Sequence, residues 1–350
     1  MTTRIPVAIL GATGTVGQKF ITLLADHPWF EIVQLAASAE RVGKRYGDEV
    51  RWRELTPLPA HVADLRFTLA EPGHGARLAF SALDAPVARD VEPAFARAGV
   101  LVVSNASAFR MESDVPLLIP EVNAAHLGLI ARQRRERGWS GAIIVNPNCS
   151  TAALVTAIAP LHHAFGLRVA TVATLQAASG AGYPGVPALD LIGNVIPHIG
   201  GEEEKIEAET MKILGQLEGD AITPAGITVS AMVHRVPVVD GHLVSASLGF
   251  DRAPSVAEAI AVLEGFRGDP MVAGLPSSPA LPIEVDRRAD RPQSRLDLDR
   301  GHGMTVTVGR VRPCPLQHLR LVALGHNLVR GAAGAAVQNA ELAVRSGLIG

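Results

Sequence analysis

The stretch Pro6-Val7-Ala8-Ile9-Leu10-Gly11-Ala12-Thr13-Gly14-Thr15-Val16-Gly17 decides the fold of this chain. Its apolar half predicts a buried strand, and its glycines predict a turn into a helix that carries Phe20, Leu23 and Leu24 on one face. Residues 31–37 predict a second strand, which completes a βαβ unit. A glycine turn between a strand and a helix is the setting in which a dinucleotide pyrophosphate binds. We therefore expect a dinucleotide site here, with a plain tight turn as the alternative.

Two glycines of the turn are required for different physical reasons. Gly14 lets the backbone approach a pyrophosphate, and Gly17 permits close packing of the helix on the strand. The spacing Gly11-x-x-Gly14-x-x-Gly17 departs from the commoner pattern by one position in its first gap. The residues of this turn that are predicted to contact the dinucleotide are Gly11, Thr13, Gly14, Thr15 and Val16.

The end of the second strand bears on which dinucleotide binds. An NAD site usually has Asp or Glu there, whereas the 2′-phosphate of NADP needs neutral or basic groups. Here Ser38 is followed by Arg41 and Lys44, which favours NADP. Glu40 would oppose a phosphate if it points inward, so NAD stays possible. A plain polar loop over residues 38–44 is the alternative.

The pattern of strands and helices predicts an α/β protein of two domains. Strands at residues 78–82 and 100–104 with a helix at 88–98 indicate a Rossmann-type, doubly wound parallel sheet in residues 1–149. A second, α+β domain with a mostly antiparallel sheet is expected over residues 150–327. Its expected strands are 167–177, 228–238, 243–250, 304–311 and 319–323. Much of the proline-rich stretch 268–303 is predicted to be a surface excursion, and a C-terminal helix within residues 328–350 is expected to pack back on the first domain.

The composition describes an ordinary globular protein of 350 residues, with 48% apolar residues and a net charge of −2. No basic stripe predicts a nucleic-acid partner, and no apolar stretch is long enough to span a membrane. Met1-Thr2-Thr3-Arg4 leads directly into a strand pattern without a signal-peptide layout, so a cytoplasmic location is expected. No nearby cluster of cysteines or carboxylates supports a metal site, and Cys314 is expected to be structural.

Cys149 is the candidate catalytic thiol. It follows a predicted buried strand at residues 141–145 and precedes a helix expected over residues 150–160. Unpaired N–H groups and the dipole at a helix N-terminus favour the anion, so this placement predicts an acidified thiolate. A buried structural cysteine is the alternative.

Two further segments could contribute to the same site. In His234-Arg235-Val236-Pro237-Val238-Val239-Asp240-Gly241-His242, a histidine can take a thiol proton and an arginine can bind a carboxylate. The turn between Arg235 and His242 would let both reach one pocket. The second segment is residues 200–207, Gly-Gly-Glu-Glu-Glu-Lys-Ile-Glu. Its acids and lysine would usually form the solvated first turn of a helix, but the double glycine indicates a loop that comes close to another part of the molecule or to a ligand.

With these features in place, the chain resembles the archaeal and fungal branch of the aspartate-semialdehyde dehydrogenases nearly from end to end. The resemblance rests on seven segments in the family's order, which are residues 11–18 (Gly11-Ala12-Thr13-Gly14 onward), 109–116 (Phe109-Arg110-Met111 and Asp114-Val115-Pro116), 147–151 (Pro147-Asn148-Cys149-Ser150-Thr151), 176–185, 201–205, 234–237 and 329–335. It implies an architecture like that of glyceraldehyde-3-phosphate dehydrogenase and a homodimer or homotetramer.

By this resemblance Cys149 would be the nucleophile, His242 the acid/base, and Gln176 the group that orients the substrate or the thiohemiacetal. The implied reaction is NADPH-dependent reductive dephosphorylation of L-4-aspartyl phosphate to L-aspartate 4-semialdehyde through a cysteine thioester. That step belongs to lysine, methionine and threonine biosynthesis. The alternatives are reduction of an acyl-CoA, such as malonyl-CoA, on the same scaffold, and a non-catalytic dinucleotide sensor.

The resemblance also implies how the substrate and the cofactor are bound. Arg235 would hold the α-carboxylate and Glu202 the amino group, although Glu203 could exchange roles with Glu202. The implied phosphate contacts are Lys205, Arg110 and Asn148. The implied further cofactor contacts are Ser179, Gly180, Gly182 and Asn327. One departure from the family is residues 39–41, Ala-Glu-Arg, where relatives often have a Ser-Arg-Ser type sequence, so the 2′-phosphate contact is changed.

Overall fold

The structure is a computed structural model that describes residues 4–349. Met1–Thr3 and Gly350 lie outside the described residues. The start of the predicted domain 1–149, three of the four residues on which the signal-peptide expectation rests, and the last residue of the segment 328–350 therefore also lie outside them.

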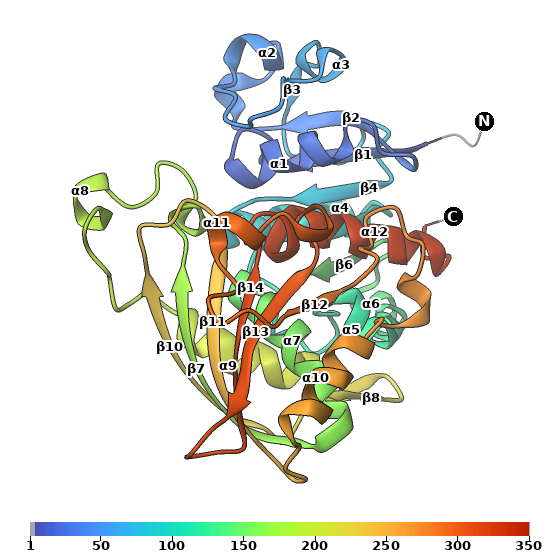
Figure 1. Cartoon of the computed structure of the whole chain (residues 1–350). Helices are drawn as coiled ribbons and strands as arrows, with labels where there is room; N and C mark the ends of the chain where they lie inside the picture. The colour runs from blue at the N-terminus through green and yellow to red at the C-terminus, as the bar shows by residue number, and fades with distance from the viewer. Residues whose placement is uncertain (1–3, 350) are drawn as a thin grey trace.

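The first sheet consists of six parallel strands in the order β3-β2-β1-β4-β5-β6 (Figure 1). This is the strand order of a dinucleotide-binding Rossmann fold, so the predicted doubly wound parallel sheet is confirmed. Its strands are β1 (Ile5–Leu10), β2 (Phe30–Ala36), β3 (Phe67–Thr68), β4 (Leu78–Ser81), β5 (Leu101–Ser104) and β6 (Ala142–Val145). Its helices are α1 (Thr15–Leu24), α2 (Tyr46–Glu49), α3 (Ala60–Ala63), α4 (Ala85–Arg97), α5 (Pro120–Asn123) and α6 (Leu129–Arg137).

The turn between β1 and α1 is as tight as its glycines predict. Gly11 has a left-handed φ of 81°, and a Cβ there would lie 2.8 Å from the carbonyl oxygen of Ala82. A Cβ at Gly17 would lie 2.2 Å from the carbonyl oxygen of Gly11. Only glycine therefore lets α1 begin this close to β1. Gly14 is the exposed residue before the helix, and its backbone can be approached from outside.

The second sheet has six strands in the order β10-β7-β11-β14-β13-β12. Its three central pairings are antiparallel and its two outer pairings are parallel, so the sheet is mixed and its antiparallel part lies in the middle. The strands are β7 (Leu167–Gln176), β10 (Thr228–Arg235), β11 (His242–Phe250), β12 (Ile283–Asp286), β13 (Val306–Pro313) and β14 (Leu319–Gly325). A separate hairpin pairs β8 (Gln216–Glu218) with β9 (Ala221–Thr223).

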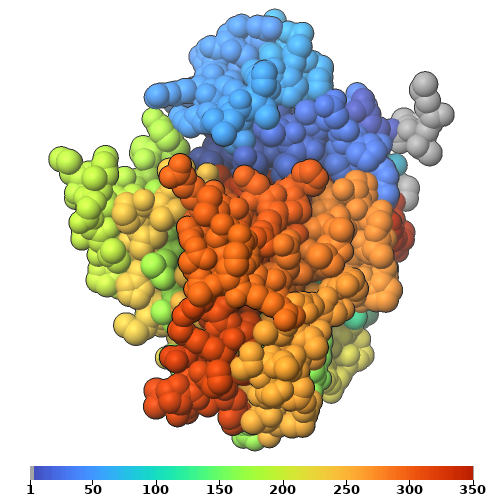
Figure 2. Space-filling view, in the orientation of Figure 1, coloured from blue at the N-terminus to red at the C-terminus, as the bar shows by residue number. Residues whose placement is uncertain are grey.

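Residues 268–303, expected to be largely a surface excursion, lie only partly at the surface. Figure 2 shows this segment, in orange, over the front of the molecule. However, it contains the edge strand β12, and its Val272 and Leu275 pack into the core of the first domain. Pro282 comes immediately before β12, a position where an edge strand tolerates proline because no ladder hydrogen bond is lost. The strand β12 was therefore not predicted from the sequence, although much of the segment lies at the surface.

Helices cover one face of the second sheet. They are α7 (Cys149–Phe165), α9 (Glu202–Ile213) and α10 (Val256–Gly265), and inward-facing residues such as Val172, Val244 and Leu321 form one apolar core with α7 and α10. The opposite face carries Thr171, Met232 and other outward side chains of the same strands. The short helices α8 (Ala188–Leu191) and α11 (Ser294–Asp297) lie in the connections.

The last segment of the chain returns to the first sheet. A π-helical turn, Val329–Ala333, continues into α12 (Gly334–Arg345). α12 contacts β4, β5, α1 and α5, and Figure 1 shows it beside β4. Its buried Ala336 and Val337 belong to the apolar core of the first domain.

Candidate active site

A cavity of about 650 Å³ lies between the two sheets, where β4, β5, β7 and β10 end. Ligands of open α/β sheets bind at the carboxyl ends of the strands, so its position suits a ligand. The predicted site residues that line it are Thr15, Val16, Arg110, Asn148, Cys149, Gln176, Ser179, Gly180, Gly182, Glu202, Lys205, Arg235 and Asn327. Those outside its lining are Gly11, Thr13, Gly14, Ser38, Arg41, Lys44 and His242.

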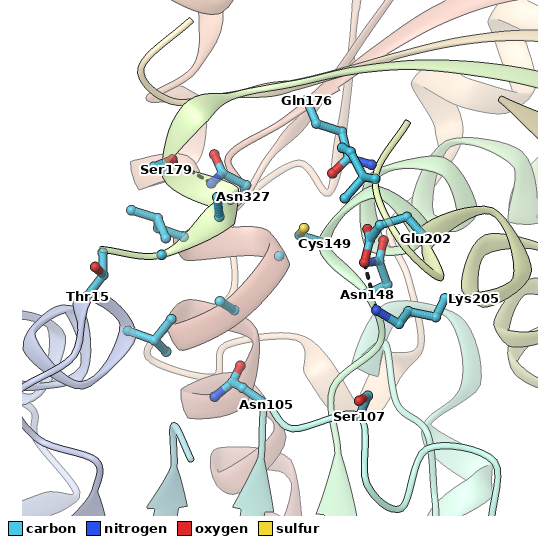
Figure 3. Close-up of a pocket in the computed structure, with 18 of the residues that line it drawn as sticks. Thr15, Asn105, Ser107, Asn148, Cys149, Gln176, Ser179, Glu202, Lys205 and Asn327 are labelled. Carbon is cyan, nitrogen blue, oxygen red and sulfur yellow. Dashed lines mark hydrogen bonds and ion pairs between the residues drawn. The ribbon is translucent and has the colours of Figure 1, made fainter. Parts of the chain in front are cut away.

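Cys149 is the first residue of α7, one residue earlier than the predicted helix start. The side-chain oxygen of Asn148 caps this helix by accepting from the backbone N–H groups of Ser150 at 2.9 Å and Thr151 at 3.3 Å. Figure 3 shows Cys149 between two groups of side chains, with Gln176 and Glu202 on one side and Ser179 and Asn327 on the other. The thiol therefore lies at the centre of the cavity lining.

The free protein does not hold Cys149 as an acidified thiolate. Burial, together with the carboxylate of Glu202, raises the pKa of the thiol to about 12. Arg110 and Arg235 act in the opposite direction, as does the backbone N–H of Ser150, but they do not overcome burial. The helix N-terminus alone is too weak an influence here, so the expectation of an acidified thiol is wrong for the free protein.

His242 begins β11 and is fully buried. Its Nδ1 accepts from the backbone N–H of Ala177 at 3.1 Å, which assigns the ring proton to Nε2. Nε2 has no partner among the described residues, and a Cβ added to Gly180 would lie 3.0 Å from it. Burial, with the charge of Arg235 nearby, lowers the pKa of His242 to about 3. The ring is therefore neutral and is covered by Gly180 rather than open to the cavity.

Arg235 and Gln176 end two neighbouring strands. β10 pairs with β7 in parallel, and the register places Arg235 beside Gln176. Arg235 donates to the carbonyl oxygen of Ala177 at 2.7 Å, and burial lowers the pKa of its guanidinium. Its remaining donors are available to a carboxylate in the cavity.

The structure separates the two neighbouring glutamates at the start of α9. Glu202 lines the cavity, forms an ion pair with Lys205 at 2.9 Å and accepts from the side-chain nitrogen of Asn148 at 2.6 Å. Glu203 instead accepts from the backbone N–H of Val233 on the edge strand β10 at 3.0 Å. Only Glu202 of this pair faces the cavity.

Glu209 lies behind the cavity lining and supports two residues of it, and the sequence did not predict this role. Its carboxylate is almost fully buried and forms an ion pair with Arg110 at 3.0 Å. It also accepts from the backbone N–H of Asn148 at 2.6 Å, and burial raises its pKa. Its position seven residues after Glu202, two turns along the same helix, was the available signal.

The part of the cavity nearest α1 fits a dinucleotide. Thr15 and Val16 line it from the N-terminal turn of α1, where the capping residue Gly14 offers no side-chain hydrogen bond. The backbone N–H groups there are suited to a pyrophosphate. Asn327 donates to Ser179 at 2.8 Å and accepts from the backbone N–H of Gly241 at 2.8 Å, which fixes its amide in the lining. Asn105 and Ser107, after β5, line the cavity too and were missed, although the end of a parallel strand is a signal for them.

Arg41 and Lys44 lie away from this cavity. Arg41 donates to the backbone oxygen of Glu49 at 3.0 Å, and Lys44 lies 3.5 Å from the Glu49 carboxylate. Ser38 precedes the short 3₁₀ turn that contains Arg41 and makes no side-chain capping hydrogen bond. Arg41 and Lys44 therefore both interact with Glu49, a contact that the sequence did not predict.

Within residues 4–349, no group of His, Cys, Asp or Glu is arranged to hold a metal ion. No described helix is long and apolar enough to cross a membrane.

Comparisons with known proteins agree with this architecture. Residues 6–130 match the family model of the semialdehyde dehydrogenase NAD-binding domain, and residues 158–330 match that of the semialdehyde dehydrogenase dimerisation domain. The aspartate-semialdehyde dehydrogenase of Archaeoglobus fulgidus is 52% identical over 99% of this chain and 100% of its own length. That of Schizosaccharomyces pombe is 45% identical over 98% of this chain and 99% of its own length.

Solved structures give the same result. Aspartate-semialdehyde dehydrogenase with NADP from Candida albicans has a TM-score of 0.91 at 41% identity, covering 99% of this chain and 100% of that one. Aspartate-semialdehyde dehydrogenase II of Vibrio cholerae, complexed with ASA, has a TM-score of 0.78 at 29% identity, covering 98% and 99%. With matching domains, full-length relatives and a cysteine at the centre of the inter-sheet cavity, this chain belongs to the aspartate-semialdehyde dehydrogenase family.

Proposed function

We propose that this protein catalyses NADPH-dependent reductive dephosphorylation of L-4-aspartyl phosphate to L-aspartate 4-semialdehyde. The observation that carries the proposal is the arrangement of one cavity. Cys149 lies between a nucleotide-binding helix N-terminus and a set of charged groups suited to an amino acid and a phosphate. The cytoplasmic location stays a prediction.

In the proposed reaction, the sulfur of Cys149 attacks the acyl carbon. The carbon–oxygen bond to phosphate breaks, and inorganic phosphate leaves with the electron pair. The resulting thioester gains a hydride at the same carbon, and the carbon–sulfur bond then breaks to release the semialdehyde. A nicotinamide dinucleotide bound in the cavity would supply the hydride. Sulfur suits both steps because it is a strong nucleophile and a good leaving group.

The charged residues of the cavity would position the substrate. Arg235 would bind the α-carboxylate, and Glu202 would bind the α-amino group. This pairing would also activate the thiol, because an ammonium group beside Glu202 offsets the carboxylate charge that raises the pKa of Cys149. Arg110 and Lys205 would bind the phosphate, whose charge they match.

His242 and Gln176 would act at the reacting oxygen. The neutral ring of His242 carries its proton on Nε2, so it can donate to an oxyanion once Gly180 moves aside. Gln176 lines the cavity, and its amide nitrogen donates one N–H to the Thr174 hydroxyl at 3.3 Å, which leaves the second N–H for the thiohemiacetal oxygen. Gly182 and Ser179, in the loop that carries Gly180, would contact the coenzyme.

The decisive experiment measures phosphate-dependent reduction of NADP with aspartate semialdehyde. Cys149→Ser is expected to abolish turnover while nucleotide binding, followed by fluorescence titration, is kept. Substantial residual turnover in this variant would refute the mechanism. Oxidation of NADPH with malonyl-CoA, in the absence of activity with aspartate semialdehyde, would support the acyl-CoA alternative. Nucleotide binding without either activity in the wild type would support the sensor alternative.

NADP is the proposed coenzyme, with NAD as the alternative. The proposal is supported by Ser38, Arg41 and Lys44 at the end of the second strand and by the NADP-bound relative from Candida albicans. The position of Glu49 between the two cations means that a 2′-phosphate would have to compete with its carboxylate. Comparison of KM for NADP and NAD in the wild type and in Ser38→Ala tests this; an unchanged preference would exclude Ser38 from the contact.

We propose that the protein forms a homodimer, or a homotetramer of two such dimers, through the helix-free face of the second sheet. Thr171, Ser230 and Met232 are exposed on this face, and the matching family model is that of a dimerisation domain. Light scattering of the wild type and of Met232→Glu tests the proposal. A monomeric wild type would refute it.

A further inference from the structure

The side chain of Arg330 is the largest that is fully buried in the described part of the chain. It extends away from the cavity, although its neighbours Gly331 and Ala332 line the cavity. Both Arg330 and its partner Glu121 have side chains only 2% exposed. None of the proposed catalytic or binding steps uses either residue.

Arg330 lies in the π-helical turn Val329–Ala333. The backbone N–H of Gly331 bonds to the carbonyl of His326 at 3.0 Å, and that of Ala333 bonds to the carbonyl of Leu328 at 3.0 Å, which are the five-residue bonds of a π-helix. Single π-helical turns are rare and are often found at functional sites. This turn brings the chain unusually close to the nucleophile, because a Cβ at Gly331 would lie 2.5 Å from the Cβ of Cys149.

Arg330 fixes this turn to three helices at once. It makes a bidentate ion pair with Glu121 of α5, with nitrogen–oxygen distances of 2.9 and 2.7 Å. It also donates to Gln338 of α12 at 3.1 Å and to Thr156 of α7, the helix of the nucleophile, at 3.3 Å. Burial alone raises the pKa of the Glu121 carboxyl, but the charge of Arg330 and the hydrogen bonds keep that pKa below its ordinary value, so the pair is ionised.

A second connection holds the turn from the other side. The side-chain nitrogen of Asn146, three residues before Cys149, donates to the carbonyl oxygen of Ala332 at 2.8 Å. Asn339 of α12 in turn donates to the side-chain oxygen of Asn146 at 2.6 Å. The turn is therefore tied to chain segments on both sides of the nucleophile.

Burying an ion pair is costly, and apolar residues of similar volume often give equal or greater stability. A pair in this position is thus better explained by the geometry that it imposes than by stability. We propose that Arg330 and Glu121 are positioning residues, whose buried pair fixes the π-helical turn against Cys149 and so sets the placement of the thiol relative to the coenzyme. The inference rests on the coenzyme site proposed above.

The test compares Glu121→Gln and Arg330→Lys with Asp297→Asn. Asp297 is the control because its side chain is also fully buried and ion-paired, with Arg291 and Arg300, but lies outside the cavity lining. All three variants are expected to lower Tm. Only the first two are expected to change the reactivity of Cys149 toward iodoacetamide in the free protein, by about threefold or more, since they release the turn that packs on it. Peptide mass spectrometry separates Cys149 from the other free cysteine, Cys314.

Steady-state kinetics provides the second measurement. Glu121→Gln is expected to lower kcat at least about tenfold, equivalent to about 1.4 kcal/mol, while KM for the coenzyme changes less than about threefold. The isotope effect with coenzyme deuterated at the nicotinamide C4 is expected to rise, because hydride transfer becomes slower relative to the other steps. A variant that is merely less stable would show neither change.

The proposal is overturned if Glu121→Gln and Asp297→Asn have the same kcat, isotope effect and alkylation rate. If Glu121→Gln does not fold, Thr156→Val replaces it. That variant removes one hydrogen bond to Arg330 and leaves the ion pair, so a fall in kcat of about twofold or more is expected, and an unchanged kcat and alkylation rate would overturn the proposal. If the wild type lacks aspartate-semialdehyde activity, the proposed function fails, while the alkylation comparison still tests the positioning role.

Discussion

The side-chain nitrogen of Asn148 donates to the carboxylate of Glu202 at 2.6 Å, while its side-chain oxygen caps the helix that begins at Cys149. One side chain thereby connects the helix of the proposed nucleophile, Cys149, to the acid proposed to bind the substrate's amino group. The carboxylate of Glu209 accepts a hydrogen bond from the backbone N–H of the same asparagine. The side chain of Asn148 keeps one N–H for a ligand, so Asn148 is a structural support of the site as well as a proposed phosphate contact.

Two substitutions separate the functions of Asn148. Serine is as good a helix cap as asparagine, whereas alanine loses about 1 kcal/mol of stability at such a position. Asn148→Ser is expected to unfold near the wild-type denaturant midpoint and Asn148→Ala at a lower one. Both are expected to lower kcat/KM for the semialdehyde, since both lose the contact with Glu202. Equal stability of the two variants would contradict the capping role, and wild-type kcat/KM in Asn148→Ser would contradict the role in orienting Glu202.

Neutralising Glu202 is expected to make the free thiol more reactive. Burial is the largest cause of the high pKa of Cys149, and the Glu202 carboxylate is the next. Glu202→Gln removes that charge, so the pKa of Cys149 should fall and the alkylation rate at mildly alkaline pH should rise. Turnover is expected to fall, because the proposed contact with the substrate's amino group is lost. The matched control is Glu203→Gln, because Glu203 bonds to Val233 on β10 and does not line the cavity. A similar rate increase in both variants would show that the effect is not local.

The buried His242 gives a predicted pH dependence of stability. Its pKa falls from 6.5 to about 3 on folding, so between these values only the unfolded chain takes up the proton. The free energy of unfolding therefore decreases as the pH falls below 6.5, by up to about 1.4 kcal/mol per pH unit from this group, and is unaffected by it above. Denaturation at about pH 5.5 and about pH 7.5 should show a smaller difference in His242→Asn than in the wild type. The exposed His302, replaced in the same way, should leave that difference unchanged.

The glycine turn between β1 and α1 could be predicted from the sequence because most of its constraints are local. Gly17 is needed because a Cβ there would meet the backbone of Gly11, and Gly11 has a left-handed φ. The close approach of Gly11 to Ala82, after β4, is an additional constraint from a distant part of the chain. The choice between Glu202 and Glu203 could not be made from the sequence. It depends on where α9 begins and on the edge strand β10, which Glu203 contacts across about thirty residues of chain.

Other features of the site depend on tertiary neighbours that no local pattern shows. The sequence placed Cys149 at a helix N-terminus, but the pKa of the thiol is decided by burial and by Glu202 on another helix. Similarly, the pocket shared by Arg235 and His242 was expected from their separation along the chain. The structure covers His242 with Gly180, a residue of a loop from another strand.

The buried Glu209 offers a test of how the proposed phosphate site is held. Glu209 accepts from Arg110 at 3.0 Å, and Arg110 also donates to the backbone oxygen of Asn105 at 2.8 Å. These two contacts fix the guanidinium while leaving other donors for a ligand in the cavity. Glu209→Gln should keep one acceptor for the backbone N–H of Asn148 but present an amide N–H to Arg110, which breaks the ion pair.

Arg110 then loses its orientation, so KM for phosphate in the oxidative direction is expected to rise about tenfold, while KM for the semialdehyde changes less than about threefold. Glu207→Gln is the control, since Glu207 lies on the same helix and accepts from the backbone N–H of Ala231 on β10, away from the cavity. A fall in the phosphate KM of Glu209→Gln would mean that its carboxylate competes with phosphate for Arg110 instead of orienting it. An unchanged KM for phosphate would show that Arg110 does not bind phosphate. Glu209 is the only buried carboxylate that pairs with Arg110 among the described residues, so its loss should change the affinity of this guanidinium for phosphate.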